Sequence, residues 1–477
     1  MTLPKNTEWK PPAADARDVQ GIVISAYPKM LNAAFLMVQF GPVPAGTNTG
    51  AKAWLQDVAT RITNAEGERS PSINLAISAA GLRSIGLDET VMSTFARPFR
   101  EGMTFGNRPR FLGDVGLQDP SNWDWSDCAS RPTGVHALLM LYARDLVGIQ
   151  NLSTAEKKEL VRFGLTLVGE LCQQVNLDSQ GVRHEHFGFA DGISQPVLVD
   201  GDAVPVARRA IHEIAAGEVV LGQTNTYGTP AAGPLVAKSS SAERALQKAS
   251  LAGFFDLGRN GTYLVVRQLK QDVTAFWDNM NSAKNGLTDE QGTPATAEWL
   301  AEKSVGRTKS GELLTPGGTS ADNDRGFFAT DRAGYGCPVT SHIRRANPRD
   351  GLAPKREDVT DIIQATNRHR IMRRGRIYGE PAVDPLTRDN KTRGLIFACL
   401  NSEIDRQFEF VQHTWLLNPM FGGAFDQSDP LIGPQCPFRI PSEPVRQQPV
   451  LETFITVIGG GYFFLPSLSA IRYLGQI

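Results

Sequence analysis

Residues 184–201, HEHFGFADGISQPVLVDG, place two histidines and Asp191 among three glycines. A carboxylate held rigidly in a turn can accept a proton and return it, so Asp191 is a candidate general base. His184 and His186 alternate on one face if the segment is extended, and they could bind a metal, although no cysteine or carboxylate accompanies them at ligand spacing. The structural alternative for Asp191 is an ordinary turn, because Asp-Gly is a common turn pair.

Two later segments combine histidine with arginine. Residues 336–350, GCPVTSHIRRANPRD, contain His342 followed by three arginines, and a proline and an aspartate then stop any helix. Residues 369–381, HRIMRRGRIYGEP, place Arg373 and Arg374 directly after an apolar pair. Taken singly, the first segment is typical of a solvated basic loop and the second of a charged strand end.

Several other kinds of site are disfavoured. The chain lacks the GxxxxGK[ST], GxGxxG, HExxH and GxSxG patterns, which argues against nucleotide-binding, zinc-protease and serine-hydrolase functions. Its five cysteines are scattered, with no CxxC pair, so a disulfide framework, a zinc site and an iron–sulfur cluster are not expected. This cysteine usage fits a reducing cytoplasm.

Length and composition predict a large globular protein. The 477 residues are 41% hydrophobic and 21% charged, which predicts a sizeable core and two domains. With 49 basic and 50 acidic side chains, the net charge of −1 provides no field that would attract nucleic acid or an anionic membrane. No secretory signal or transmembrane stretch is recognisable, so we expect a cytoplasmic protein with no membrane partner.

The elements that must position these residues alternate between strands and helices. The pattern predicts strands over 32–41, 134–143, 261–272 and 393–402, a strand–helix step over 72–103, helices over 53–63, 154–171, 273–283 and 405–417, and a closing strand pair over 452–467. This order indicates an α+β fold with helices on one face of a sheet. A looser Gly-, Pro- and Ser-rich region follows residue 201, so we place the domain boundary there and predict domains 1–205 and 206–477.

Taken together, the three segments resemble the dye-decolorising peroxidase family. Gly188, Asp191 and Gly192 match that family's GxxDG motif, with FADGISQP matching beyond it. The segment HIRRANPRD is similar to the loop that carries the haem-ligating histidine, and IMRRG is similar to the strand that carries the distal arginine. DVQGIVISAY and RGLIFACL also match, so the resemblance covers nearly the whole chain, and its length suits the larger members.

The resemblance implies two ferredoxin-like domains with antiparallel sheets, of the dimeric α/β-barrel type. Haem b, iron protoporphyrin IX, would be enclosed mainly by the C-terminal domain. His342 would be the proximal ligand of the haem iron. A carboxylate usually bonds the other ring nitrogen of such a histidine, and Asp405 is the candidate, with Glu403 as the alternative.

On the distal side the resemblance assigns the proton chemistry to Asp191. This carboxylate would take a proton from hydrogen peroxide and return it to the departing oxygen, which favours activity at acidic pH. Arg373 would stabilise the charge that develops as the O–O bond breaks, with Arg374 as the fallback. Leu395 and Phe397 match positions that line the distal pocket, and plain strand core is their alternative.

Three further residues have roles implied by the resemblance. Tyr378 matches a position that relays electrons from bulky substrates in some larger members, although Arg376 and Ile377 replace the usual neighbours and a buried packing role is the alternative. His186 and Arg344 could each bond a haem propionate.

The sequence therefore predicts a haem peroxidase. It would use hydrogen peroxide to oxidise dyes, phenols and similar aromatic donors by one-electron steps. The alternatives are a haem-handling or peroxide-scavenging protein of the same fold in which dye oxidation is incidental, and a non-haem α+β binding protein.

Overall fold

The computed structural model describes residues 9–41, 48–67, 69–128, 134–200, 211–315, 326–442 and 447–477. The predicted domain boundary at residues 205 and 206 lies outside these described residues.

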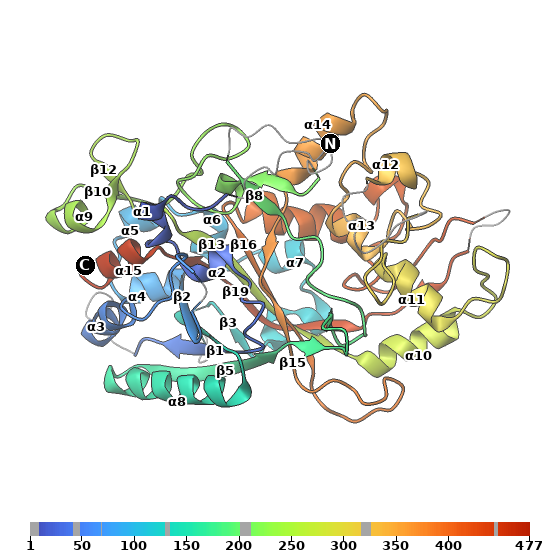
Figure 1. Cartoon of the computed structure of the whole chain (residues 1–477), viewed down its shortest axis with the longest axis horizontal. Helices are drawn as coiled ribbons and strands as arrows, with labels where there is room; N and C mark the ends of the chain where they lie inside the picture. Colours follow the sequence, from blue (N-terminus) through green and yellow to red (C-terminus); the bar gives the residue numbers. More distant parts are fainter. Residues whose placement is uncertain are drawn as a thin grey trace.

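A closed barrel of eight strands organises the described chain (Figure 1). Of the ten strands in the main sheet, eight form a ring in which each strand is antiparallel to its neighbours, and β3 (Trp125–Ser126) and β14 (Met372–Arg373) add at its edges. In ring order the eight strands are β13 (Thr262–Gln271), β16 (Gly394–Asn401), β15 (Arg376–Tyr378), β5 (Thr166–Gln174), β1 (Asn32–Gln39), β4 (Ala137–Ala143), β2 (Ser72–Ser78) and β19 (Ile455–Leu465). The predicted α+β class with antiparallel sheets is confirmed.

The barrel consists of two four-stranded halves that meet at two narrow seams. One half contains β5, β1, β4 and β2, and the other contains β15, β16, β13 and β19. One seam is the single pair Ile377↔Gln174, and the other joins Phe463 and Phe464 to Ser78 and Ile77. The broad pairing therefore lies within each half, and in the second half it joins strands as far apart in the sequence as β13 and β19.

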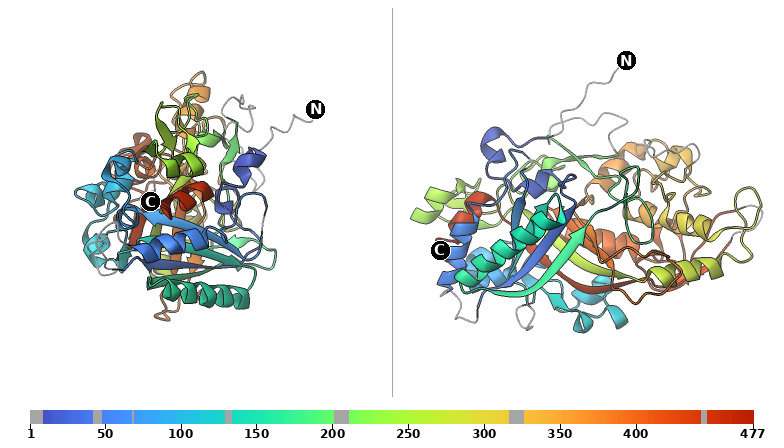
Figure 2. Two further views of the ribbon diagram at one scale, coloured as in Figure 1. Left: turned by 90° about the vertical axis from the view of Figure 1, so that its left-hand side faces the viewer. Right: turned by 60° about the horizontal axis from the view of Figure 1, so that its bottom comes forward.

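Alternation along the strands separates an inner from an outer apolar face. The inner face packs side chains from both halves, including Phe35, Leu138, Val266, Ile396 and Phe463. The outer face of the first half packs against α3 (Thr49–Val58), α4 (Ala79–Ser84), α8 (Leu146–Arg162) and α15 (Leu468–Leu474), and Figure 2 shows α8 lying along the sheet. Burial on both faces explains why these strands read as continuous apolar runs.

Two predicted elements differ from the structure. Helix α8 begins after Asp145, whose carboxylate caps the Gly148 N–H at 2.7 Å, and it ends at Arg162. Gly164 adopts a φ of +71°, and residues 166–174, partly predicted as helix, form β5. The closing strand pair predicted over 452–467 is one strand, β19, because Gly459, Gly460 and Gly461 stay extended within the sheet.

Further helices lie between β13 and β19 in the chain, and several of them lie toward the end of the molecule opposite α3 and α15 (Figure 1). They are α10 (Val273–Ala283), α11 (Ala297–Val305), α12 (Phe327–Thr330), α13 (His342–Ala346), α14 (Val359–Asn367) and the π-helical turns η4 (Asp405–Glu409) and η5 (Val411–Leu416). The other short elements include α1 (Ala13–Ala16), α2 (Gly21–Ile24), α5 (Glu89–Met92), α6 (Arg97–Glu101), α7 (Arg108–Leu112), α9 (Ser240–Ala245), β7 (Arg183–His184), β8 (Val197–Val199), β12 (Phe254–Asp256) and β17 (Cys436–Pro437).

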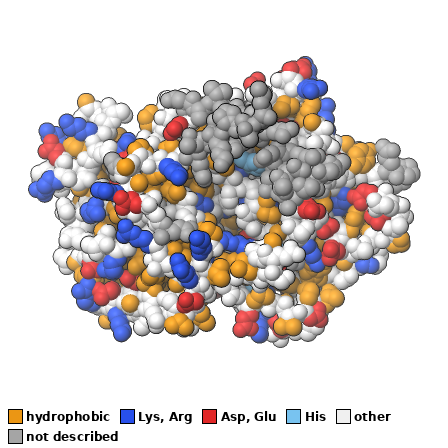
Figure 3. Space-filling view, in the orientation of Figure 1, with side chains coloured by type: hydrophobic (Ala, Val, Ile, Leu, Met, Phe, Trp, Pro, Cys, Tyr) orange, Lys and Arg blue, Asp and Glu red, His pale blue; other side chains and the backbone are white. Residues whose placement is uncertain are grey.

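Basic and acidic side chains are interspersed on the face shown in Figure 3. Among the described helices, none combines the length and the apolar character that a membrane crossing requires.

Candidate active site

A cavity of about 320 Å³ lies on the outer face of the second half-barrel. Its floor is formed by side chains in register on neighbouring strands, since Leu395 of β16 pairs with Leu269 of β13, which in turn pairs with Val457 of β19. Phe397 lies two residues farther along β16 and also lines the cavity. The two positions expected to line a pocket, Leu395 and Phe397, therefore do so.

His342 enters this cavity from the first position of α13. Its Nδ1 lies 2.9 Å from Oδ2 of Asp429, a carboxylate that is fully buried, whereas the imidazole is 31% exposed. Because an ionised carboxylate only accepts hydrogen bonds, Nδ1 is the protonated nitrogen. Nε2, which has no hydrogen-bond partner among the described residues, is left with its lone pair available to a ligand.

Asp429 is held as an anion by several donors. Its Oδ1 accepts the backbone N–H groups of Leu431 at 2.9 Å and Ile432 at 3.0 Å. Burial alone would raise the pKa of Asp429, but the charge and hydrogen bond of His342, together with the Leu431 N–H, bring this pKa below its ordinary value. The carboxylate is therefore a stable acceptor for the imidazole.

The prediction that Asp405 supports His342 is wrong. Asp405 is exposed at the start of η4, and its Oδ1 accepts the backbone N–H of Arg406. The alternative residue, Glu403, forms an ion pair with Arg406 instead, with its Oε2 at 2.9 Å from Arg406 Nε. The partner of His342 lies 87 residues along the chain, in the loop before β17.

Asp191 lies in a turn that two glycines permit. Gly188 and Gly192 adopt φ values of +97° and +82°, which a residue with a Cβ rarely does. The backbone N–H of Asp191 donates to the carbonyl of Arg183 at 2.8 Å, and the Gly192 N–H donates to Asp191 Oδ1 at 2.6 Å. Asp191 lines the cavity with its carboxylate partly exposed, so the turn and the chemical role are compatible.

Glu185 fixes the start of the same turn. Its carboxylate accepts the N–H groups of Phe187 and Phe189, each at 2.9 Å, and the side-chain amide of Gln271 at 2.7 Å. These bonds attach the GxxDG segment to strand β13 at the edge of the cavity.

Arg373 lies beside Asp191 in the lining of the cavity. Its Nη1 is 3.9 Å from Asp191 Oδ1, and its Nη2 donates to the carbonyl of Ile193 at 2.5 Å. The next residue, Arg374, points to the other side of the strand and donates to the carbonyls of Ile22 at 2.6 Å and Val23 at 2.8 Å. Strand alternation therefore brings Arg373, and not the fallback Arg374, to the cavity.

Four further arginines line the cavity. Arg267 is paired with the Asp114 carboxylate, and the other three, Arg307, Arg349 and Arg370, form what we call the arginine cluster. Arg307 and Arg349 donate to Ser194 Oγ at 2.9 and 3.3 Å, and Arg370 donates to the Ser194 carbonyl at 3.0 Å. Burial, followed by repulsion from neighbouring arginines, lowers the pKa of Arg370 to about 9 and that of Arg307 to about 10. An anion placed here would relieve that repulsion.

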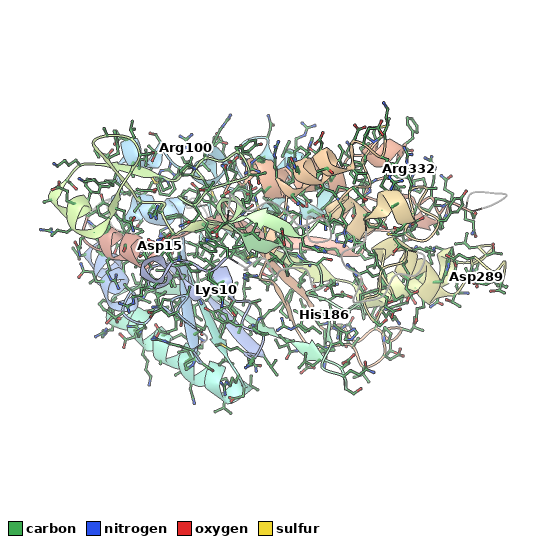
Figure 4. The ribbon with its side chains drawn as sticks, turned by 45° about the horizontal axis from the view of Figure 1, so that its top comes forward. Lys10, Asp15, Arg100, His186, Asp289 and Arg332 are labelled. Atoms are coloured by element: carbon green, nitrogen blue, oxygen red, sulfur yellow. The ribbon has the colours of Figure 1, made fainter. Side chains whose placement is uncertain are left out.

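Neither His186 nor Arg344 is among the residues that line the cavity. His186, labelled in Figure 4, bonds the backbone carbonyl of Tyr378 through Nε2 at 2.8 Å. Arg344 follows His342 by two residues, which turns it away from His342 on a helix, and it donates to the carbonyls of Cys337 and Arg332 at 2.7 and 3.1 Å. The predicted propionate contacts are therefore not supported for these two residues.

Tyr378 lies at the end of β15 with its hydroxyl oxygen buried. The ring packs against the inner apolar face of the barrel. Burial raises the pKa of Tyr378 to about 12. The alternative of a packing role is therefore consistent with its surroundings, while its role in electron transfer stays a prediction.

The residues of the cavity fit a haem. An imidazole with an available Nε2 faces apolar walls that include Phe397 and Leu416, and the arginine cluster offers positive charge for carboxylate groups. Within the described part of the chain, no group of three or more His, Cys, Asp or Glu residues could hold a metal ion. His184 and His186 do not converge, because the His184 ring bonds Asp178 and the Gly188 carbonyl.

The sequence did not identify Asp429, Arg307 or Arg370 as site residues. Asp429 lies in an ordinary turn sequence, SDPLIG. From this sequence alone it would be interpreted as an aspartate that accepts backbone N–H groups of its own turn. Arg370 lies 63 residues after Arg307, so no local spacing connects them.

Dye-decolorizing peroxidases recur among the known proteins to which the chain is similar. The chain is 30% identical over 438 residues to a dye-decolorizing peroxidase of Mycetinis scorodonius, covering 84% of this chain and 76% of that protein. It is 26% identical to the multifunctional dye peroxidase of Amycolatopsis sp., covering 90% of this chain and 88% of that protein. A solved DyP-type peroxidase of Anabaena sp. superposes with a TM-score of 0.75 at 23% identity, covering 99% of this chain and 100% of the other. No family model matches the chain.

Proposed function

The chain belongs to the dye-decolorising peroxidase family, and we propose that it is a haem peroxidase that reduces hydrogen peroxide while oxidising dyes, phenols and other aromatic donors by one-electron steps. One solved peroxidase with the same fold is a complex with 2,6-dimethoxyphenol, which supports phenols as donors. The observation that carries the proposal is the placement of Asp191, Arg373 and His342 around one cavity.

The cofactor we propose is haem b. His342 would ligate its iron through Nε2, and the arginine cluster would hold its propionates. Leu395 and Phe397 would pack against its distal face from strand β16. When bound, the haem supplies the redox centre at which peroxide is reduced and from which donors are oxidised.

Asp191 performs the proton transfer. Its carboxylate accepts the proton of hydrogen peroxide and returns it to the oxygen that leaves as water. The Gly188 and Gly192 turn holds the carboxylate in one place, so little reorganisation accompanies the transfer. Arg373 carries a permanent positive charge 3.9 Å from Asp191, so it stabilises negative charge on the departing oxygen.

Asp429 positions the proximal histidine. By accepting the Nδ1 proton, it fixes the imidazole tautomer in which Nε2 is the ligand, and it increases the basicity of that nitrogen. Tyr378 would relay electrons from donors too bulky to enter the cavity.

The test is rapid mixing of the haem-loaded protein with hydrogen peroxide, with absorbance as the readout. We expect Asp191→Asn to react about a hundredfold more slowly than wild type, the range that loss of a general base produces, with unchanged haem content. Arg374→Lys is the matched control, since that side chain points away from the cavity. A variant Asp191→Asn that reacts as fast as wild type would remove Asp191 from the mechanism.

A further inference from the structure

A second hollow, of about 260 Å³, lies beside the loop that leads into α13. Its walls include Tyr335, Val339, Thr340, Ala424, Gln427 and Arg439, and we call it the Arg439 hollow. None of the described residues that line it also lines the haem cavity. It is therefore a separate site, whose chemistry can be considered by itself.

Gln427 presents hydrogen-bond donors to this hollow. It is only 2% exposed, and its Oε1 accepts the backbone N–H of Arg439 at 2.8 Å and the Thr340 hydroxyl at 3.3 Å. A backbone N–H can only donate, so the amide oxygen must face Arg439. The NH₂ group is then the part of the amide that remains for a ligand, and it has no partner among the described residues.

Arg439 adds a positive charge. Its Nη1 donates to the carbonyl of Phe425 at 2.8 Å, which fixes the side chain without neutralising it. Among the described residues, Arg439 has no carboxylate within ion-pair distance, and none of those lining the hollow is acidic. A guanidinium beside an amide NH₂ is a donor set that suits a carboxylate or sulfonate.

The rest of the wall is aromatic and apolar. Tyr335 is 46% exposed, and Val339, Ala424 and Pro441 complete the surface around it. An aromatic ring with an open edge or face favours a second ring. The volume of about 260 Å³ lies just below the usual range for drug-sized ligands, so it suits a molecule with a single ring.

The hollow is lined by residues that lie close in the chain to His342 and Asp429. Thr340 precedes His342 by two residues, and Gln427 precedes Asp429 by two residues. The buried guanidinium of Arg345 donates to the backbone carbonyls of both Thr340 and Gln427. A molecule bound to Thr340, Gln427 and Arg439 would therefore lie against the backbone that carries the proximal histidine and its carboxylate.

We propose that the Arg439 hollow binds single-ring phenols that carry a carboxylate or sulfonate, and that these are reducing substrates of the enzyme. The proposal rests on the peroxidase function proposed above. Each phenol loses one electron and its hydroxyl proton, so one hydrogen peroxide and two phenols give two waters and two phenoxyl radicals. The acidic group stays bound to Arg439 and Gln427 and takes no part in the redox step.

Binding is tested first, with a probe that cannot be oxidised. Benzenesulfonate is titrated into the haem-loaded protein by calorimetry, with and without excess cyanide, which occupies the distal position of haem iron. We expect cyanide to leave the affinity unchanged and Arg439→Gln to weaken it about tenfold, the effect of one charge-assisted hydrogen bond. Arg439→Lys, which keeps the charge, should restore part of the affinity.

The matched control is Arg332→Gln. Arg332, labelled in Figure 4, is an exposed arginine that also donates one bond to a backbone carbonyl, that of Pro354 at 2.7 Å, and it does not line the hollow. This variant should bind benzenesulfonate as wild type does. Equal affinity for wild type and Arg439→Gln, or loss of binding in cyanide, would overturn the proposed site.

Turnover then tests whether the bound molecules are donors. In Arg439→Gln we expect the KM for para-hydroxybenzenesulfonate to rise about tenfold, with kcat unchanged and the KM for unsubstituted phenol within about twofold of wild type. Unchanged KM values for both phenols would overturn the donor assignment. Failure of the peroxidase function would look different, because wild type would then oxidise neither phenol while the calorimetric result would still stand.

Discussion

The carboxylate of Asp429 determines which nitrogen of His342 is available in the cavity, and Asp429→Asn tests this directly. In the variant, the backbone N–H groups of Leu431 and Ile432 still require an acceptor, so the amide oxygen must stay with them. The NH₂ group then faces Nδ1 of His342. Because an NH₂ group only donates, the imidazole must move its proton to Nε2, where it blocks ligation.

The alternative for this variant is a flipped amide, which leaves two backbone N–H groups without their acceptor. Either outcome weakens the ligand, and loss of a residue that orients a metal ligand typically costs about 10–100-fold in affinity. That corresponds to about 1.4–2.8 kcal/mol. The assay is the rate and extent of haem transfer to an apo-globin acceptor, with the Soret band as the readout.

Asp405→Asn is the control, because Asp405 is exposed and bonds only the Arg406 backbone through its side chain. It should retain haem as wild type does. If Asp429→Asn holds haem with wild-type affinity and an unchanged Soret maximum, the tautomer argument is incorrect. If Asp405→Asn is instead the variant that loses haem, the original assignment from the sequence would be restored.

Three other predictions follow from the same contacts. Arg373→Leu should lower kcat/KM for hydrogen peroxide about 10²–10³-fold in steady-state assays, whereas Arg374→Leu should mainly lower the thermal unfolding midpoint, since it leaves the buried carbonyls of Ile22 and Val23 without donors. Tyr378→Phe should slow turnover of a bulky anthraquinone dye several-fold while leaving phenol turnover unchanged. If the variant oxidises the dye as fast as wild type does, Tyr378 is not the relay. The folded pKa of Asp429 lies below the ordinary value of 3.8, so its stabilising contribution is complete above that value and is lost only as pH falls through the lowered pKa. The difference in thermal unfolding midpoint between haem-free wild type and Asp429→Asn should therefore persist down to pH 3.8, and a difference that vanishes well above that pH would contradict the link.

The strands could be predicted because burial on both faces makes them continuous apolar runs. Residues 32–39, 137–143 and 262–271 were each recognised on this basis. The error at residues 166–174 arose because β5 begins only four residues after the last residue of α8, and the apolar spacing of the strand continued that of the helix. Closure of the barrel was expected only from the family resemblance, because its seams consist of one and two residue pairs and leave no pattern in the sequence.

The site was predictable where its chemistry is local. Asp191 lies between Gly188 and Gly192, and their positive φ values make the motif a conformational requirement as well as a chemical one. The resemblance favoured Arg373 over Arg374, and the opposite directions in which the two side chains leave the strand give the physical reason. Asp429 and the arginine cluster acquire their roles from contacts between distant segments, for which the local sequence carries no signal.

The distance between His342 and Asp429 is maintained by a third residue that the sequence placed only in a basic loop. Arg345 is fully buried, and it donates to the carbonyl of Thr340 on one side and to those of Trp415 and Gln427 on the other. A guanidinium presents its donors in a rigid plane, so these bonds fix the two loops relative to each other before any ligand binds. Desolvation of that charge lowers the pKa of Arg345, while the nearby Asp429 carboxylate opposes the shift. The same carboxylate thus orients the imidazole and compensates the buried cation, so a residue in an ordinary turn sequence connects His342 to Arg345.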